Sequence, residues 1–322
     1  MSTSPHRSGV IALDLGGTKL ASAIFSPAGD VLGKSNIPLG DRTGQAVGAF
    51  IANEIRRLRQ LAADQPIELS AAGVCVPGIV RPQTGRVWAP NIAGWDDYPL
   101  QDEIRGVVGG ERMKVVVTTD RAASILGEVW RGAAQGCRHA IFLAVGTGIG
   151  AGIFADGRVL DGSTGIAGAI GWLALSRPFR QEYVGCGNFE SHASGNGLAK
   201  VARQLLAQRP EYAGPLSTAP ELTAHDVFTA YDAGDEIARD VIAQAIEYWG
   251  MASANLISLF NPEKLVFGGG VFGPATKFID DIRTEAGRWA QPVAFQQTQF
   301  LPSQLHGDAA LTGTAYLAMQ AK

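Results

Sequence analysis

Residues 10–25 decide the fold of this chain, and they read VIALDLGGTKLASAIF. An apolar run that contains a single carboxylate, Asp14, leads into the turn Gly16-Gly17-Thr18-Lys19, after which a second apolar run begins. Two short apolar runs on either side of a glycine-rich turn are typical of a β-hairpin. Another turn and the pair Val31-Leu32 follow, so the sequence predicts a meander of three strands.

The same hairpin pattern returns about 130 residues later in the chain. Residues 141–154 read IFLAVGTGIGAGIF, and aligning Gly16 with Gly146 places Ile11 on Ile141 without a gap. A repeat of this length is too long for the unit of a solenoid. It favours an internal duplication, with two similar α/β lobes in one chain.

The remaining predicted strands and helices fit two such lobes. Short β-branched or aromatic runs end at Asp120 and at residues 268–270, as parallel strands do when they deliver residues to a crevice. Apolar spacing near three and four predicts helices at residues 45–61 and 236–260. We therefore expect an α/β fold with a small lobe at 1–117, a larger lobe at 118–307, and a helix at about 308–322 that packs back on the small lobe.

The composition is that of a globular protein. Among its 322 residues 46% are apolar and 18% are charged, and the net charge is −3, so a nucleic-acid-binding surface is not expected. No run approaches the roughly 18 apolar residues of a membrane span, and the first nine residues do not resemble a secretion signal. The three scattered cysteines cannot build a disulfide framework. We expect a cytoplasmic protein without nucleic-acid or membrane partners.

Glycine is unusually frequent, with 41 residues, and both predicted hairpins turn on glycines. Because glycine has no Cβ, such turns let backbone N–H groups approach an anion closely. Tight turns alone would explain either hairpin, but their duplication favours a nucleotide site. Asp14 stands in an apolar strand, where an ionised carboxylate needs a partner, and Mg²⁺ on a triphosphate supplies one. A dinucleotide site is disfavoured because a strand follows Gly150, where that motif needs a helix.

Several motifs occur together in one order: Asp14 to Lys19, Asp120 after a strand, Gly146 to Gly150, and Asn261-Pro262-Glu263 leading to the glycines at 268–270. In this order and rough spacing the chain resembles the ROK family. That family groups bacterial sugar kinases with related repressors on the duplicated actin-like (ribonuclease H-like) ATPase fold. The resemblance runs from about residue 10 to residue 318. It implies two lobes around a cleft for a nucleotide and a sugar.

The resemblance also implies an ATP- and Mg²⁺-dependent sugar kinase. Asp120 matches the catalytic aspartate that accepts the proton of the sugar hydroxyl, and Asp14 matches the residue that holds Mg²⁺ through water. For Asp120, a plain helix N-cap explains the local sequence equally well. The residues implied around the nucleotide are Asp14, Gly16, Gly17, Thr18, Lys19, Gly146, Thr147 and Gly148, with Gly268 and Gly269 beside the nucleoside.

The sugar pocket that the resemblance implies is only partly retained. Asn91 and Glu190 match sugar-binding residues of the family, whereas Thr119 replaces the usual asparagine. The family's Gly-Glu-x-Gly-His segment corresponds to residues 168–172, so its glutamate is lost and its histidine is replaced by Trp172. We therefore expect a changed substrate, such as an amino sugar, a cyclitol or a modified hexose. Trp172 either offers an apolar face to a sugar ring or fills the space of a missing zinc lobe.

The zinc-binding run of the family is lost as well. A closed structural zinc site needs four sulfur or nitrogen ligands. Cys186 aligns with a non-ligand position, and the four ligand positions hold Trp172, Gln181, Tyr183 and Asn188. We predict no zinc site. His192, two residues after Glu190, is either a ligand of the sugar pocket or a surface histidine, and the surface position is favoured.

A sugar or cyclitol kinase is thus the leading hypothesis, and a catalytically silent sugar sensor is the alternative. Family repressors carry a DNA-binding domain before the first glycine hairpin, and the 13 residues before Asp14 disfavour that alternative. An ATPase with a non-sugar acceptor remains a third hypothesis. The resemblance also implies a homodimer or homotetramer.

Overall fold

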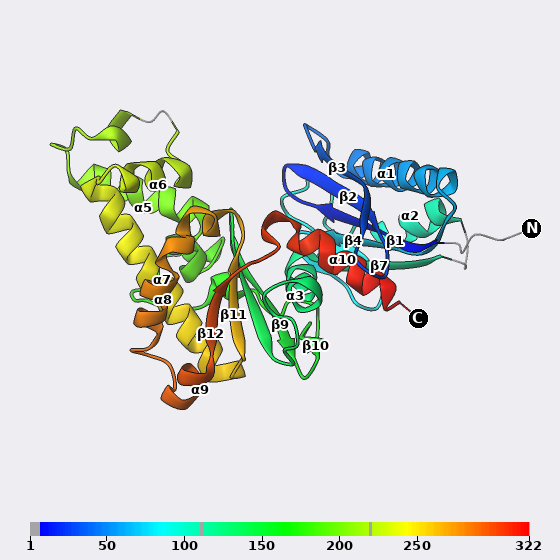
Figure 1. The fold of residues 1–322 in the computed structure, drawn as a ribbon. Helices are drawn as coiled ribbons and strands as arrows, with labels where there is room; N and C mark the ends of the chain where they lie inside the picture. Colours follow the sequence, from blue (N-terminus) through cyan, green and yellow to red (C-terminus); the bar gives the residue numbers. More distant parts are fainter. Residues whose placement is uncertain (1–6, 110–112, 219–220, 322) are drawn as a thin grey trace, which may run out of the picture. The chain divides into compact units, whose positions relative to one another are not determined.

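The computed structural model describes residues 7–109, 113–218 and 221–321. Contacts divide the chain into two compact units, each built around its own sheet (Figure 1). Unit 1 comprises residues 1–135, 159–167 and 308–322, and unit 2 comprises residues 136–158 and 168–307. The expected boundary after residue 117 falls inside unit 1, because the helix that begins at Asp120 packs on the C-terminal helix of the same unit.

Unit 1 is built on a five-stranded sheet in the order β3-β2-β1-β4-β7. The predicted meander forms its antiparallel half, and β4 and β7 continue the sheet parallel to β1. The strands are β1 (Arg7–Leu15), β2 (Lys19–Phe25), β3 (Val31–Pro38), β4 (Ile67–Val76) and β7 (Lys114–Thr119), and a small separate sheet pairs β5 (Ile79–Val80) with β6 (Val87–Trp88). The first hairpin of the sequence is therefore confirmed.

Helices cover both faces of this sheet, because successive side chains of β1 point to opposite sides. Ile11 and Leu13 share one apolar core with α1 (Gly44–Asp64) and α2 (Leu100–Val108). Val10 and Ala12 face α10 (Ala309–Met319), which also packs on α3 (Asp120–Arg131). The short turn η6 (His306–Asp308) precedes α10.

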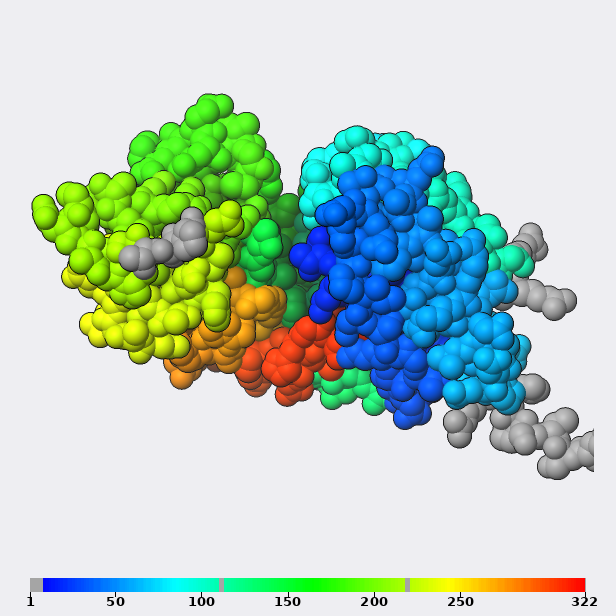
Figure 2. Space-filling view, turned by 90° about the horizontal axis from the view of Figure 1, so that it is seen from above, coloured from blue at the N-terminus to red at the C-terminus, as the bar shows by residue number. Residues whose placement is uncertain are grey.

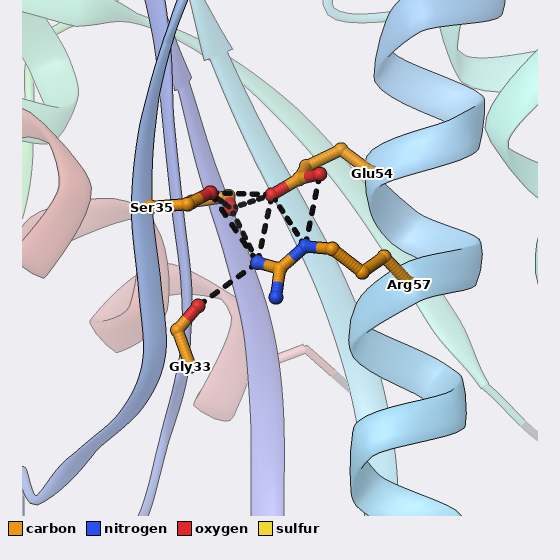
Figure 3. A network of polar contacts seen from close by, with 5 residues as sticks. Gly33, Ser35, Glu54 and Arg57 are labelled. Atoms are coloured by element: carbon orange, nitrogen blue, oxygen red, sulfur yellow. Dashed lines mark hydrogen bonds and ion pairs between the residues drawn. The ribbon is translucent and has the colours of Figure 1, made fainter.

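A buried carboxylate ties α1 to the antiparallel half of the sheet (Figure 3). Glu54, only 5% exposed, accepts hydrogen bonds from Ser22 at 2.5 Å and from Ser35 at 2.6 Å. Arg57, one turn further along α1, donates to the same carboxylate at 2.8 Å. The Glu54 carboxylate thus has both a positively charged partner and hydrogen-bond donors, which a buried carboxylate needs.

Unit 2 repeats the plan of the first sheet in the order β10-β9-β8-β11-β12. A central strand again pairs with an antiparallel hairpin partner on one side and with parallel strands on the other. The strands are β8 (Ala140–Val145), β9 (Ile149–Ala155), β10 (Arg158–Val159), β11 (Lys264–Gly268) and β12 (Gln299–Pro302). The predicted duplication is confirmed, and the fold is the α/β, duplicated actin-like ATPase fold.

The helices of unit 2 pack around α7, whose buried face includes Trp249. They are α4 (Asn188–Ala193), α5 (Gly195–Gln208), α6 (Ala224–Asp232), α7 (Glu236–Phe260), α8 (Ile279–Ala286) and α9 (Pro292–Gln297), and the short turns are η1 (Ile170–Trp172), η2 (Gln181–Val184), η3 (Pro215–Thr218), η4 (Gly270–Phe272) and η5 (Pro274–Phe278). None of the helices in the described ranges combines the length and the apolar character that crossing a bilayer requires.

Candidate functional site

The carboxylate of Asp14 lies at the carboxyl end of β1, beside β4. Asp14 is paired with Cys75 across the two parallel strands, and the Cys75 thiol donates to Asp14 Oδ1 at 3.1 Å. Burial raises the pKa of Asp14 to about 6, against the opposing hydrogen bond from Cys75, and the charge of Asp120 raises it further. Asp14 and Asp120 are therefore electrostatic neighbours in unit 1. A bound cation would relieve this desolvated carboxylate, so the donor chemistry fits Mg²⁺.

The glycine turn that follows Asp14 projects from the sheet. Gly16 N–H donates to the carbonyl oxygen of Lys19 at 2.9 Å and closes the turn. Gly17, Thr18 and Lys19 are all exposed. The turn can therefore present its backbone and the Lys19 ammonium to an anion next to Asp14.

Asp120 begins α3 directly after β7, and its neighbour Thr119 performs the N-cap function. The Thr119 hydroxyl accepts the N–H of Ala122 at 3.2 Å, so the alternative interpretation of Asp120 as the N-cap is wrong. Asp120 Oδ1 accepts the N–H of Arg121 at 2.8 Å. Burial raises the pKa of Asp120, and the Arg121 guanidinium opposes that rise. Thr119 keeps its hydroxyl proton as a donor.

Asn91 lies on an exposed turn of unit 1, after β6. Trp95 holds this turn against the rest of unit 1. Its indole N–H donates to the carbonyl oxygen of Gly44 at 3.0 Å, and its ring stacks on Tyr98. Asn91 is thus presented by a well-anchored turn. Its proposed contact with a sugar stays a prediction.

Unit 2 contains a cavity of about 870 Å³ at the β8–β9 turn. Gly146 and Thr147 of that turn line it together with the first residues of α5, and Gly195 N–H donates to the Gly146 carbonyl oxygen at 2.8 Å. The amino end of α5, capped by Ser194, favours a negative charge. Figure 2 looks onto the side of this unit where the yellow-green helices α5 and α6 adjoin the orange segment around η4 and η5.

The cavity combines an apolar wall with polar groups at its edge. The volume lies within the range of about 300–1,000 Å³ that is usual for small-molecule sites. Its apolar lining includes Leu206, Leu216, Leu222, Phe228 and Val271, and its polar lining includes Asn196, Arg203, Ser217, Glu221, Thr223 and His225. A flat base, a ribose and phosphates would find suitable surroundings here.

Gly268 and Gly269, expected beside the nucleoside, are not among the residues that line the unit 2 cavity, and their place beside a nucleoside stays a prediction. A Cβ on Gly268 would lie 2.3 Å from the ring of Phe142, and Gly269 has a φ of +88° with the Val145 backbone close by. These glycines let β11 approach β8 and then turn. The cavity wall at this point is formed by Gly270 and Val271.

Glu190 lies against the β8–β9 turn of unit 2. Its Oε2 accepts the N–H of Ile149 at 2.6 Å, and a Cβ on Gly148 or on Gly171 would meet its side chain at 2.7 or 3.0 Å. Burial raises the pKa of Glu190. The structure thus brings together Glu190, Gly148 and η1, which ends at Trp172. The Trp172 side chain is 57% exposed, so it does not fill an interior space of unit 2.

The residues at the family's zinc positions do not form a metal site. Within the described ranges, no group of three or more histidine, cysteine, aspartate or glutamate side chains is arranged to hold a metal ion. Trp172 is exposed, the Tyr183 hydroxyl bonds to His192 at 2.9 Å, and the Asn188 amide is bound to a neighbouring loop. The donor set does not fit zinc.

His192 corrects one expectation from the sequence. It is 6% exposed rather than a surface residue, and its ring stacks on Tyr248 with a centroid distance of 4.6 Å. Burial lowers its pKa to about 4. The position two residues after Glu190 on a six-residue helix gave no signal of this contact, because Tyr248 is 56 residues away in the chain.

Sequence reasoning also missed most of the unit 2 cavity. Ser194-Gly195 at the start of α5 carries a recognisable capping signal, which could have indicated an anion-binding helix end. Arg203, Leu222 and Phe228 carry none, since only tertiary contacts place α5 beside α6.

Comparisons with known proteins agree with the fold and the motifs. The ROK family model matches residues 10–321. A glucokinase from Halalkalibacterium halodurans is 31% identical over 317 residues, which cover 96% of this chain and 94% of that protein. A xylose repressor from Caldicellulosiruptor bescii is 26% identical over 312 residues, which cover 94% of this chain and 76% of the repressor.

A solved structure extends the comparison to three dimensions. The ROK family glucokinase from Streptomyces griseus, in complex with glucose and AMPPNP, superposes with a TM-score of 0.78 at 29% identity. The match covers 97% of this chain and 99% of that chain. The chain is therefore similar along its whole length to a kinase crystallised with a sugar and an ATP analogue.

Proposed function

This chain belongs to the ROK family, and from that premise we propose that it is a sugar kinase, which transfers the γ-phosphoryl group of ATP to a hydroxyl group of a sugar or cyclitol. One observation carries the proposal. Asp120, which Thr119 relieves of helix capping, is a partly buried carboxylate whose pKa is raised by desolvation, next to Asp14 and an exposed glycine turn. A base and a phosphate-binding turn in one unit are what phosphoryl transfer to an alcohol requires.

ATP would occupy the unit 2 cavity. Leu216, Leu222 and Phe228 would surround the base, and Gly146, Thr147 and the amino end of α5 would receive the phosphates. Asp14 would hold Mg²⁺ through water, and bound Mg²⁺ neutralises charge on the phosphates. Within unit 1, Lys19 and the glycine turn would offer donors to a phosphate next to Asp14.

Asp120 would act as the general base. Because its Oδ1 already accepts the Arg121 N–H, Oδ2 is the oxygen that takes the hydroxyl proton as the sugar attacks the γ-phosphorus. Thr119 and Asn91 of unit 1 are proposed to bind sugar hydroxyls, and so, separately, is Glu190 of unit 2. The raised pKa of Asp120 makes it a stronger base than an ordinary aspartate.

The substrate would differ from that of a typical family member. Ala169 and Trp172 stand where glutamate and histidine contact sugar hydroxyls in the family, so two polar contacts are replaced by apolar surface. The exposed Trp172 ring offers the apolar face of a sugar a stacking partner. Amino sugars, cyclitols and modified hexoses are the first substrates to test. A homodimer or homotetramer stays a prediction.

A coupled assay of ADP release across a panel of sugars and cyclitols tests the proposal. We expect turnover with at least one panel member, and Asp120→Asn should lower kcat by about a thousandfold, because the amide cannot accept the proton. Full activity of the Asn variant would refute Asp120 as the base.

A silent sugar sensor is the second candidate, and the similarity to a xylose repressor favours it. Calorimetry separates the two functions. Sugar binding with neither ATP binding nor turnover would support the sensor and contradict the kinase.

A further inference from the structure

A cluster of buried polar side chains holds the segment that carries Trp172 and Glu190. We name it the Tyr248 cluster. Its members come from four segments of unit 2, namely the loop after η1, the turn η2, α4 and α7, and each except Ser176 is at most 6% exposed: Ser176, Tyr183, Asn188, His192 and Tyr248. Hydrogen bonds and one ring stack connect all five.

The first arm of the cluster fixes the start of α4. Asn188 Oδ1 accepts the N–H groups of Leu175 at 2.9 Å and Ser176 at 3.1 Å, and its Nδ2 donates to Ser176 Oγ at 3.0 Å. Ser176 Oγ in turn shares a hydrogen bond of 2.7 Å with the Tyr248 hydroxyl on α7. The loop after η1 and the start of α4 are thus both tied to α7.

The second arm ties the turn η2 to the end of α4. The Tyr183 hydroxyl and His192 Nε2 are 2.9 Å apart, and the His192 ring lies over Tyr248 at an interplanar angle of 13°. Tyr183 also accepts the N–H of Gly187 at its carbonyl oxygen, at 2.8 Å. Both arms therefore end on Tyr248.

We propose that the Tyr248 cluster is a metal-free positioning device, which holds Glu190 and Trp172 in place for the sugar where relatives would rely on a bound metal ion. This inference rests on the proposed kinase function. A helix of six residues, such as α4, has little stability of its own, so its orientation depends on its side-chain anchors. Glu190 lies two residues after Asn188 and contacts Gly171, next to Trp172, so loosening Asn188 moves both sugar-facing groups.

The donors in the cluster do not suit zinc. His192 is its only imidazole, and its other members offer hydroxyl and amide groups, which are poor zinc ligands. Cys186 lies outside the cluster and bonds to Ser191 Oγ at 3.1 Å. The hydrogen bonds and the ring stack instead join these side chains to one another, which rigidifies a buried polar site, and of their buried polar atoms only His192 Nδ1 lacks a partner among the described residues.

Metal analysis of the purified protein is the first test. Mass spectrometry should find only traces of zinc, and 1,10-phenanthroline should leave the melting temperature unchanged. About one tightly bound zinc per chain, or unfolding on chelation, would overturn the proposal. Neither readout requires a known substrate.

Asn188→Ala is the second test, because it removes the central anchor of the cluster. It should raise KM for the sugar about tenfold or more while KM for ATP changes less than about twofold. Asn188→Asp retains the acceptor oxygen for Leu175 and Ser176 and should restore most of the sugar affinity. Should Asn188→Ala fail to fold, Tyr248→Phe removes one hydroxyl, keeps the ring stack, and should show a smaller effect of the same kind.

Thr298→Ala is the matched control. Thr298 is also buried in unit 2, with its hydroxyl donating to Pro262 and Ala294 at 2.9 Å, but it precedes β12, at the opposite end of the sheet from the β11–η4 turn. Both substitutions should lower stability, and only the Asn188 variant should change KM for the sugar. Equal effects of the two variants on both KM values would contradict a positioning role.

Hydrogen exchange separates this inference from the proposed function. Amides in residues 172–192 should exchange faster in Asn188→Ala than in the wild type, whether or not a substrate has been found. Unchanged exchange in that segment would overturn the positioning role. A missing turnover with faster exchange would refute the kinase proposal alone.

Discussion

The sequence alone allows two roles for Asp120, helix N-cap and catalytic base, and the structure gives the first of them to Thr119. Both a capping residue and a catalytic base are expected between a strand and a helix, and both are satisfied by a short polar side chain. The hydrogen bond from Ala122 to Thr119 identifies Thr119 as the N-cap, which leaves Asp120 available for the role of base that we propose. The burial of His192, in contrast, depends on its contact with Tyr248, and no pattern in the neighbouring sequence predicts it.

Arg121 tunes the proposed base, which leads to a prediction for the pH profile. Its guanidinium opposes the rise in the pKa of Asp120. Removing that charge in Arg121→Ala should raise the pKa further, and because the base must be ionised, the acidic limb of kcat/KM should move to higher pH. Arg121→Lys retains a positive charge and should move the limb less. A limb that shifts to lower pH in the Ala variant would contradict this account.

The raised pKa of Asp14 leads to a prediction about the free energy of unfolding. Its pKa is 3.8 in the unfolded chain and about 6 in the folded protein. Below both pKa values the carboxyl is protonated in the folded and the unfolded state, and it does not change the free energy of unfolding. Above pH 6 the carboxyl is ionised in the folded state, where burial disfavours the charge, and the free energy of unfolding is lower by about 3 kcal/mol. Without metal and nucleotide, Asp14→Asn should therefore have a higher free energy of unfolding than the wild type at pH 8, and an equal one at about pH 3.5.

Urea unfolding at the two pH values measures this difference. Added Mg²⁺ and nucleotide should reverse the order at pH 8, because only the wild type gains the ligand. A variant that is less stable than the ligand-free wild type at pH 8 would show that Asp14 already has a compensating partner.

At the scale of elements, the spacing of apolar residues predicted the hairpins and the long helix, which depend mainly on local sequence. The hairpins β1–β2 and β8–β9 appeared as expected, and the long helix predicted at residues 236–260 is α7. The walls of the unit 2 cavity were not predicted, because α5, α6 and η4 meet only through tertiary contacts. Gly268 and Gly269 illustrate the limit: the glycine run was recognised, but which of its glycines lines the cavity depends on Phe142 and Val145.

The attachment of α1 to its sheet gives a prediction at this scale. Glu54 accepts from Ser22, Ser35 and Arg57, and the hydrogen bonds of its carboxylate hold its pKa below the usual range against the effect of burial (Figure 3). Glu54→Gln should lower the free energy of unfolding at pH 7 by about 2 kcal/mol, because an amide bonds less strongly to Arg57.

The pH dependence of that loss follows from the sign of the shift. A lowered pKa stabilises the folded state above pH 4.5 and the stabilisation disappears as the pH falls, so the two proteins should converge in acid. Arg56→Ala, which removes only an exposed bond to Asn53, is the control and should change stability little. A difference that grows on acidification would refute the ionised state of Glu54.

At the scale of the whole molecule, the repeated hairpin was the decisive signal. It predicted two similar α/β units because the same strand–turn–strand pattern must pair in the same way twice, and the two sheets have matching strand orders. The substrate cannot be predicted in this way. In our proposal, specificity depends on the polar groups that are missing at Ala169 and Trp172 and on how the Tyr248 cluster holds Glu190, and a sequence repeat carries neither kind of information.

The central claim is that this chain moves the γ-phosphoryl group of ATP to a sugar-like hydroxyl with Asp120 as the base. Incubation with ATP labelled by ¹⁸O in the γ-phosphoryl group, followed by mass spectrometry of a sugar and cyclitol panel, tests it most directly. The account predicts a labelled phosphate ester of at least one panel member with the wild type, and almost none with Asp120→Asn. Label found only in inorganic phosphate, or equal ester formation by both proteins, would contradict it.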